Sequence, residues 1–272
     1  MELKIDGFNN LDTLPSIPSQ ILRALDGIEK ISAMDYNIVQ MIQYDAPIAL
    51  GVLRLSNAPL YGYPSEIFSL QQAAGLLGPS AIKNVILTTP VFERFKDYHE
   101  SDLEFDFTQL WLHTAVTASV AGGLGALIDD VESDVCFTAG LLQECGLIAL
   151  AMNFPHSMNA ILHRQAAGKK SLFQAEQEEI GFTHAEIGAR IMENWGIPAE
   201  LFEAVKNGFD ADQGNPATKL SAVIRLARRL AHNWDYGDGT QNGVSLPVEP
   251  LLDSIQVSAE KLSEWEPRLK DY

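Results

Sequence analysis

The sequence predicts an all-α protein built as two helical lobes, with no significant β-sheet. Apolar residues recur at spacings of three and four along most of the 272 residues, which is the period of amphipathic helices. No segment alternates cleanly between apolar and polar residues with period two, as a half-buried strand does. A chain of this length buries a substantial core, either as one large domain or as two smaller lobes.

Residues 1–92 are predicted to form an N-terminal helical lobe. Their apolar residues follow the helical period over 21–31 and 38–42, and again over 48–57 after an interruption at Asp45-Ala-Pro47. A further helix is expected to begin at Gly78-Pro79, because proline is favoured in the first helical turn.

Residues 93–106 have a different composition and are predicted to connect the two lobes. Six acidic residues stand there against two basic ones, Arg94 and Lys96. Such a charged stretch indicates an exposed connection, and a charged helix end is the alternative.

A second helical lobe is predicted over 107–210, with C-terminal helices over 211–272 that complete it. Helical patterns follow one another at 107–128, 134–152, 156–167, 172–180, 184–195, 199–208 and 216–234. Thr183-His-Ala-Glu186 is a capping box, which places His184 in the first turn of its helix. Gly122-Gly-Leu-Gly125 indicates close packing of helices, and the apolar residues at 251–265 are expected to pack a helical tail on the body.

The balance of charge argues against two classes of partner. The chain carries 36 acidic and 19 basic residues, for a net charge of −17. A field of this sign repels phosphate backbones and anionic lipid surfaces. We therefore expect neither nucleic acid nor a membrane as partner.

Cysteine content and hydropathy favour a cytoplasmic protein. Cys136 and Cys145 form no CxxC motif and lie among apolar residues, so we expect buried free thiols. The N-terminus has no apolar segment of the kind found in signal peptides. Residues 107–128 lack formal charge and are long enough to span a bilayer, but their polar and small residues favour a buried core helix.

Several segments, in order along the chain, resemble the HDOD domain. They are Leu14-Pro15-Ser-Ile-Pro18, Asp45–Asn57 (DAPIALGVLRLSN), Ser69–Gly78 (SLQQAAGLLG), Ala139–Gly146 (AGLLQECG) and Ile180–Pro198 (IGFTHAEIGARIMENWGIP). The resemblance runs from about Leu11 to Phe209, with one small departure, because Ala46 stands where proline usually follows the aspartate. It implies the helical fold of the HD and HD-GYP phosphohydrolases without their set of metal ligands.

The HD pattern can be placed on this chain residue by residue. Its first histidine corresponds to His113, its His-Asp pair to Gln143 and Glu144, and its later histidine to His184. A His-His pair of active relatives would fall on Asn207 and Gly208, and the last aspartate on Arg228.

Two histidines of that pattern remain, while the central pair, the second pair and the last acid are replaced. A divalent cation needs several imidazole and carboxylate ligands, and a fixed arginine cation opposes its entry. We therefore expect no metal, no cofactor and no catalytic residue. A structural alternative exists for His113 as a hydrogen-bonded core histidine and for His184 as a residue of a helix N-terminus. Glu144 is expected to form an ion pair with Arg228 across the former metal site.

The resemblance implies a non-catalytic bacterial signal-transduction module that binds signalling proteins in trans, such as a sensor kinase, a chemotaxis component or a cyclic-dinucleotide enzyme. The contact surface is expected to include the cleft between the lobes and the acidic face. One alternative is a metal-dependent phosphohydrolase with a reduced ligand set of His113, Glu144 and His184. Another is a sensor that holds an anion in a pocket formed by His113, Gln143, His184 and Arg228, because arginine suits phosphate recognition.

Overall fold

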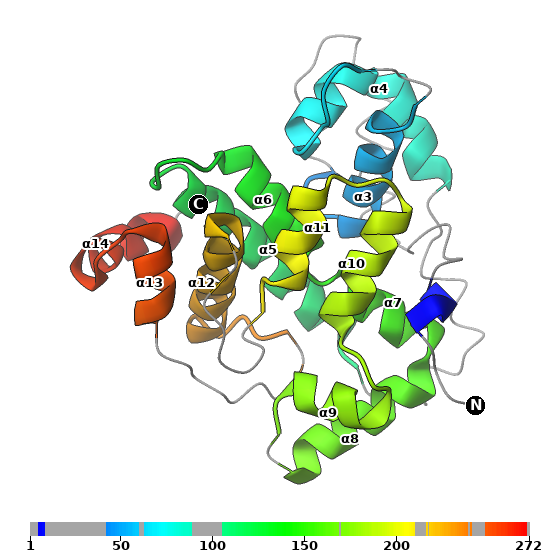
Figure 1. The fold of residues 1–272 in the computed structure, drawn as a ribbon, viewed down its shortest axis with the longest axis vertical. Coiled ribbons are helices and arrows are strands. Elements are labelled where there is room, and N and C mark those ends of the chain that lie inside the picture. Colours follow the sequence, from blue (N-terminus) through cyan, green and yellow to red (C-terminus); the bar gives the residue numbers. More distant parts are fainter. Residues whose placement is uncertain are drawn as a thin grey trace.

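The computed structural model describes residues 5–8, 42–59, 63–88, 105–168, 170–209, 216, 218–238, 240 and 248–270. In these ranges the chain forms helices and no β-strand, which confirms the predicted all-α fold (Figure 1). The elements are η1 (Ile5–Phe8), α3 (Ala46–Ser56), α4 (Leu70–Thr88), α5 (Phe107–Gly125), α6 (Ser133–Leu142), α7 (Cys145–Asn153), α8 (Pro155–Gly168), α9 (Leu172–Glu179), α10 (His184–Asn194), α11 (Ala199–Lys206), α12 (Lys219–Asn233), α13 (Glu249–Ile255) and α14 (Ala259–Lys270).

Helices α3 and α4 pack against each other and form one end of the fold (Figure 1). The interruption at Asp45 is the N-terminus of α3, where the Asp45 side chain accepts a hydrogen bond of 2.9 Å from the backbone N–H of Ile48. The expected break at Gly78 is a kink inside α4, because Gly78 has φ 72° and ψ 171°, a backbone conformation open to glycine.

Helices α5 and α6 lie in close contact, as the glycines at 122–125 predicted. A Cβ atom at Gly122 would lie 3.2 Å from the Cβ of Phe137, and one at Gly125 would lie 2.8 Å from the Sγ of Cys136. Both cysteines are free and buried, also as predicted.

One helix boundary was predicted wrongly. The apolar pattern at 134–152 suggested a single helix, but the structure has α6 and α7 with a break at Gln143 and Glu144. Gly146 follows the break, and there α7 approaches α10 so closely that a Cβ would overlap the carbonyl oxygen of His184. At this break the side chains of Gln143 and Glu144 are buried in the interior, and after it α7 packs against α10.

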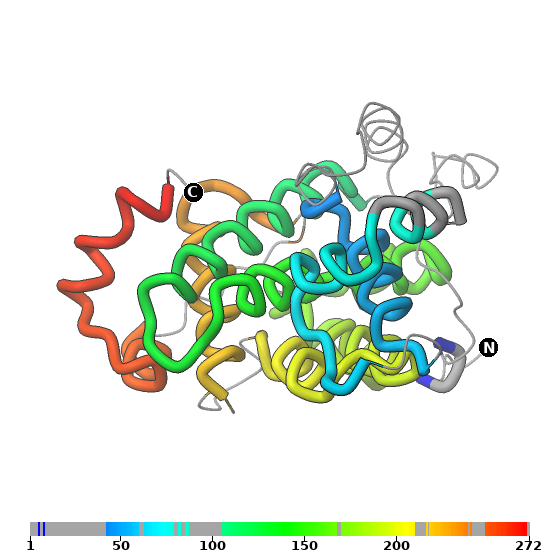
Figure 2. Tube along the Cα trace, turned by 90° about the horizontal axis from the view of Figure 1, so that it is seen from above, coloured from blue at the N-terminus to red at the C-terminus, as the bar shows by residue number. Residues whose placement is uncertain are grey.

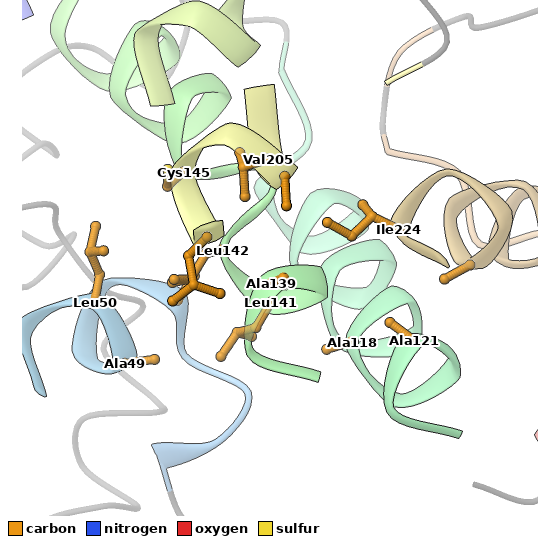
Figure 3. Close-up of a cluster of buried hydrophobic side chains, with 14 of the residues drawn as sticks. Ala49, Leu50, Ala118, Ala121, Ala139, Leu141, Leu142, Cys145, Val205 and Ile224 are labelled. Atoms are coloured by element: carbon orange, nitrogen blue, oxygen red, sulfur yellow. The ribbon is translucent and has the colours of Figure 1, made fainter. Parts of the chain in front are cut away.

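A single hydrophobic core joins α3 to the helices of the second half of the chain. Figure 3 shows Leu50 of α3 near Leu142 of α6, with Val205 of α11 and Ile224 of α12 on the other side of α6. The side chains in this core are completely or almost completely buried. Its burial supplies the main stabilisation of the fold, at roughly 25 cal/mol per Å² of apolar surface.

The C-terminal helices α13 and α14 lie at the end of the molecule away from α3 and α4 (Figure 2). Helix α13 packs on α12, and α14 packs on α5. Leu251, Leu252, Ile255 and Trp265 are buried there, so the predicted docking of the tail is confirmed.

Some predictions fall on residues outside the described ranges. They include the helical patterns at 21–31 and most of 38–42, the Leu14–Pro18 motif and the acidic connection up to residue 104. The lobe boundaries stay predictions. Among the described residues, Ser133–Asn153 is the one helical stretch apolar and long enough to cross a membrane, and 83% of its most apolar window is buried inside the fold, as is usual for core helices.

Candidate functional site

Four of the residues placed by the HD pattern meet in the interior of the fold. His113 comes from the middle of α5, Glu144 from the break between α6 and α7, His184 from the first turn of α10, and Arg228 from α12. The side chains of His113, Glu144 and His184 are fully buried, and that of Arg228 is 11% exposed. Together with their contacts described below, these residues are called the buried charged cluster.

Glu144 lies at the centre of this cluster. Its Oε1 lies 3.0 Å from Nη2 of Arg228 and 3.7 Å from Nε2 of His113, and its Oε2 lies 3.7 Å from Nε2 of His184. The carboxylate therefore forms a charge-assisted hydrogen bond to Arg228, and the two imidazoles face it at longer range. The ion pair between Glu144 and Arg228 that the sequence suggested is present.

Arg228 has partners on three sides. Besides Glu144, its Nη2 lies 3.5 Å from Oδ2 of Asp238, and its guanidinium carbon lies 4.1 Å from the ring centre of Phe209. Two carboxylates and an aromatic face thus compensate the cost of burying this cation. The guanidinium connects α12 with the start of α7 and with the segment that carries Asp238.

His184 is held by a second carboxylate that the sequence did not suggest. Its Nδ1 lies 2.7 Å from Oε1 of Glu176, and its backbone N–H donates a bond of 3.1 Å to the other oxygen of that carboxylate. Burial alone lowers the pKa of His184, but the charge and the hydrogen bond of Glu176, together with the charge of Glu144, outweigh burial and raise this pKa above its usual value. The imidazole also packs against the rings of Phe173 and Phe209, which contact each other.

His113 has the opposite protonation preference. Its Nδ1 lies 2.8 Å from the backbone carbonyl oxygen of Tyr236, so Nδ1 carries the proton and donates this hydrogen bond. The hydroxyl of Thr117 lies 3.5 Å from Nε2. Burial lowers the pKa of His113, with the charge of Arg228 acting in the same direction. The neutral imidazole is therefore favoured.

Asp238 is the residue of the cluster that sequence reasoning missed most clearly. It follows α12 in a segment rich in polar residues and glycine, yet its side chain is fully buried, and its Oδ2 lies 3.5 Å from Nη2 of Arg228 and 3.7 Å from Nε2 of His232. Burial alone raises the pKa of Asp238, but its pairing with His232 and Arg228 prevails and lowers it far below the usual value. Asp238 also accepts a hydrogen bond from the backbone N–H of Thr240, two residues later, which is an Asx-turn that an Asp among polar and glycine residues makes possible.

The remaining predicted positions behave differently. Asn207 donates a hydrogen bond of 2.8 Å from its side-chain amide to the carbonyl oxygen of Glu203, one turn earlier in the chain. Gly208 packs near Ile224 of α12, so it serves a close helix contact. Gln143 is fully buried beside Glu144, and neither its amide nitrogen nor its amide oxygen has a hydrogen-bond partner among the described residues.

The cluster is a poor match to a divalent cation. Within the ranges that the structure describes, no group of three or more His, Cys, Asp or Glu side chains is arranged to hold a metal ion. One of the two oxygens of Glu144, Oε1, is hydrogen-bonded to the guanidinium of Arg228. A permanently charged arginine so close to a candidate ligand opposes entry of a second cation.

The chain is similar to proteins of several bacteria. The HDOD domain family model matches residues 14–209. An uncharacterized protein of Treponema pallidum is 22% identical over 204 residues, which cover 73% of this chain but 38% of that protein. The MmoQ response regulator of Methylococcus capsulatus superposes with a TM-score of 0.70 at 21% identity, covering 93% of this chain and 98% of that one.

A crystal structure of an HDOD domain protein from Geobacter sulfurreducens superposes with a TM-score of 0.56 at 19% identity, covering 98% of this chain and 93% of that one. At such identities the two solved structures establish the shared fold. The family model matches well over half of the sequence, including the segments around Glu144 and His184. The chain therefore belongs to the HDOD domain family.

Proposed function

We propose that this protein is a non-catalytic signal-transduction module that acts by binding other proteins. Its fold is that of a metal hydrolase family, and in this proposal an internal ion pair has replaced the metal. The function then resides in surface contacts, and the buried charged cluster serves to hold the helices in the arrangement that presents them.

The observation that carries this proposal is the hydrogen bond between Arg228 and Glu144. Arg228 stands at the position of the last aspartate of the HD pattern, and its Nη2 lies 3.0 Å from the Glu144 carboxylate. Arginine side chains are always charged in proteins, so the guanidinium competes with any incoming cation. It links α7 to α12 without needing an ion from solution.

Two other functions receive less support from the same geometry. A phosphohydrolase with a reduced ligand set would need His113, Glu144 and His184 to share one ion, and the Glu144 oxygen nearest His113 is bonded to Arg228. An anion sensor would need free positive charge, but Arg228 already has Glu144 and Asp238 beside it.

One protein of similar fold supports a role in signalling. This protein, MmoQ of Methylococcus capsulatus, is a response regulator and so by name a signalling protein. The partners proposed here are signalling proteins in trans, among them a sensor kinase, a chemotaxis component or a cyclic-dinucleotide enzyme. The negative charge of −17 favours partners with basic contact surfaces.

The absence of catalysis can be tested on the purified full chain. We expect elemental analysis after incubation with manganese and dialysis to find far less than one metal ion per chain. We also expect no hydrolysis of a chromogenic phosphodiester or of cyclic dinucleotides above the rate of the buffer. A stoichiometric metal, or turnover lost in the Glu144→Gln variant, contradicts the proposal.

The binding role needs a second experiment. Proteins captured from the source cell are purified and mixed with the purified chain, and the complex is measured by size-exclusion chromatography with light scattering. A reproducible complex of defined stoichiometry with a signalling protein supports the proposal. If no captured protein forms a complex once both components are pure, the proposed role is wrong.

A further inference from the structure

The surface between α4, α6 and α11 contains a groove outside the buried charged cluster. It has a volume of about 920 Å³, which lies within the range of ~300–1,000 Å³ usual for ligand sites. Its walls come from the segment that leads into α4, the turn before α6, the start of α11 and the start of α12 (Figure 1). It therefore lies between the two halves of the chain that share the core.

Carboxylates line this groove, and among the residues that the structure describes no lysine, arginine or histidine lines it. They are Glu66, Asp130, Glu132, Asp134 and Glu200. Asp130 is partly neutralised, because Nζ of Lys219 lies 2.9 Å from its Oδ2. The other four carboxylates have no ion-pair partner among the described residues. Glu132 stands at the N-cap position of α6 but makes no side-chain capping bond, so its carboxylate is free to face a ligand.

The negative charge of the groove affects the pKa of Cys136, a buried thiol nearby. The pKa of Cys136 is raised to about 12, first by burial and then by the charges of Glu132 and Glu200. Apolar residues accompany the carboxylates, namely Phe68, Val131, Val135 and Leu220. Such a surface offers attraction at the rim and apolar contact between the charges, as protein interfaces do.

A smaller recess of about 290 Å³ adjoins the groove. Gln71 and Asp134 line both spaces, so the recess opens where the groove carries a negative charge. Its other lining residues include Tyr44 and Ser119, whose hydroxyl oxygens can accept hydrogen bonds. A recess with a carboxylate at its mouth and acceptors inside suits one long cationic side chain.

We propose that this groove binds an extended basic segment of a partner protein, with one lysine or arginine side chain in the recess beside Asp134. The inference deepens the proposed binding role and rests on it. A second copy of this chain fits poorly, because two molecules of charge −17 repel each other. Phosphate-bearing ligands are repelled by the same carboxylates.

The test uses the full chain and short fluorescent peptides of alternating arginine and leucine. Control peptides carry glutamate in place of each arginine. Fluorescence anisotropy at about 50 mM salt is expected to detect binding of the basic peptides only, with affinity that falls as salt is raised. Peptides of either charge binding equally, or basic peptides not binding, overturns the proposal.

The site is assigned with two triple variants that remove the same amount of charge. The groove variant combines Glu132→Gln, Asp134→Asn and Glu200→Gln, and the control variant combines Glu249→Gln, Asp253→Asn and Glu264→Gln on the distant helices α13 and α14. The groove variant is expected to bind about 10- to 100-fold more weakly, and the control variant to change less than about twofold. Equal losses in both variants mean that general charge attraction, and not the groove, binds the peptide.

Calcium and spermine distinguish a peptide groove from a simple cation site. Neither is expected to displace the bound peptide at concentrations that leave ionic strength unchanged. Displacement by either one at micromolar concentration identifies a cation site and overturns the proposal. The groove carboxylates play no part in the metal and hydrolysis experiments described above, so a failure of the groove proposal can be distinguished from a failure of the non-catalytic proposal.

Discussion

The buried ion pair between Glu144 and Arg228 should contribute strongly to stability through coupling between its two members. The test is a double-mutant cycle with Glu144→Gln, Arg228→Met and the double variant. Removing one member of a buried pair leaves the other charge uncompensated, which typically costs about 3–5 kcal/mol. The Arg228→Met variant should be the less stable of the two single variants. It removes the charge partner of Glu144 and Asp238 and the contact with Phe209, whereas Glu144→Gln leaves Arg228 paired with Asp238.

The double variant should lose about 2 kcal/mol less than the sum of the single variants, because it leaves neither member of the pair unmatched. The loss is measurable if the native chain has the usual stability of about 5–15 kcal/mol. Urea unfolding followed by circular dichroism gives the free energies, provided that the denaturant slopes agree between variants.

An exposed ion pair with the same N···O distance provides the control. Arg190 and Glu193 also approach to 3.0 Å, but their side chains are 37% and 54% exposed. Their cycle should show coupling of less than about 1 kcal/mol, because water and salt screen an exposed pair. Additive single variants at Glu144 and Arg228 would refute the claim that burial makes this pair a crosslink between helices.

Three further predictions concern the surroundings of the cluster. Gly146→Ala should destabilise the protein by at least about 3 kcal/mol, because the added Cβ would overlap the carbonyl oxygen of His184. Gly75→Ala on α4 is the control and should change stability little, because no atom of a neighbouring element lies within 4 Å of the added Cβ. Glu176→Gln should lower the free energy of unfolding more at pH 6 than at pH 9. The raised pKa of His184 in the folded protein stabilises the fold at pH values below 6.5, the pKa of the unfolded state, and this stabilisation disappears as pH rises through the pKa of the folded state. Both cysteines should resist a thiol reagent in the native protein and react after unfolding, because they are buried and burial is the main cause that raises each thiol pKa to about 12.

Each of these predictions has a result that contradicts it. Equal stability losses for the two glycine variants would mean that the contact of α7 with α10 adjusts freely. A loss with Glu176→Gln that does not depend on pH would mean that His184 is neutral over this range. Rapid labelling of either thiol in the native state would show that the core opens near that residue.

The capping and periodicity of single helices could be predicted from sequence because they depend on residues close together in the chain. Thr183 and Glu186 cap α10 with the reciprocal hydrogen bonds of a capping box. The wrong prediction of one helix over 134–152 has a tertiary cause. The break at Gln143 and Glu144 exists where α7 meets α10, and an apolar pattern along one segment carries no information about that contact.

The residues of the buried charged cluster also include some that the sequence identified and some that it did not. Alignment to the HD pattern identified His113, Glu144, His184 and Arg228, and the structure brings these four together. It did not identify Glu176 or Asp238, whose carboxylates pair with His184 and Arg228.

By itself, the sequence determined the helical class and the capping box of α10, because these follow from residue identity and local spacing. Only the tertiary structure decided which buried charges face each other, since Glu144 and Arg228 are separated by 84 residues in the chain. The energy of a charge depends on the distance to its partners and on the exclusion of water, and both quantities are properties of the packed fold.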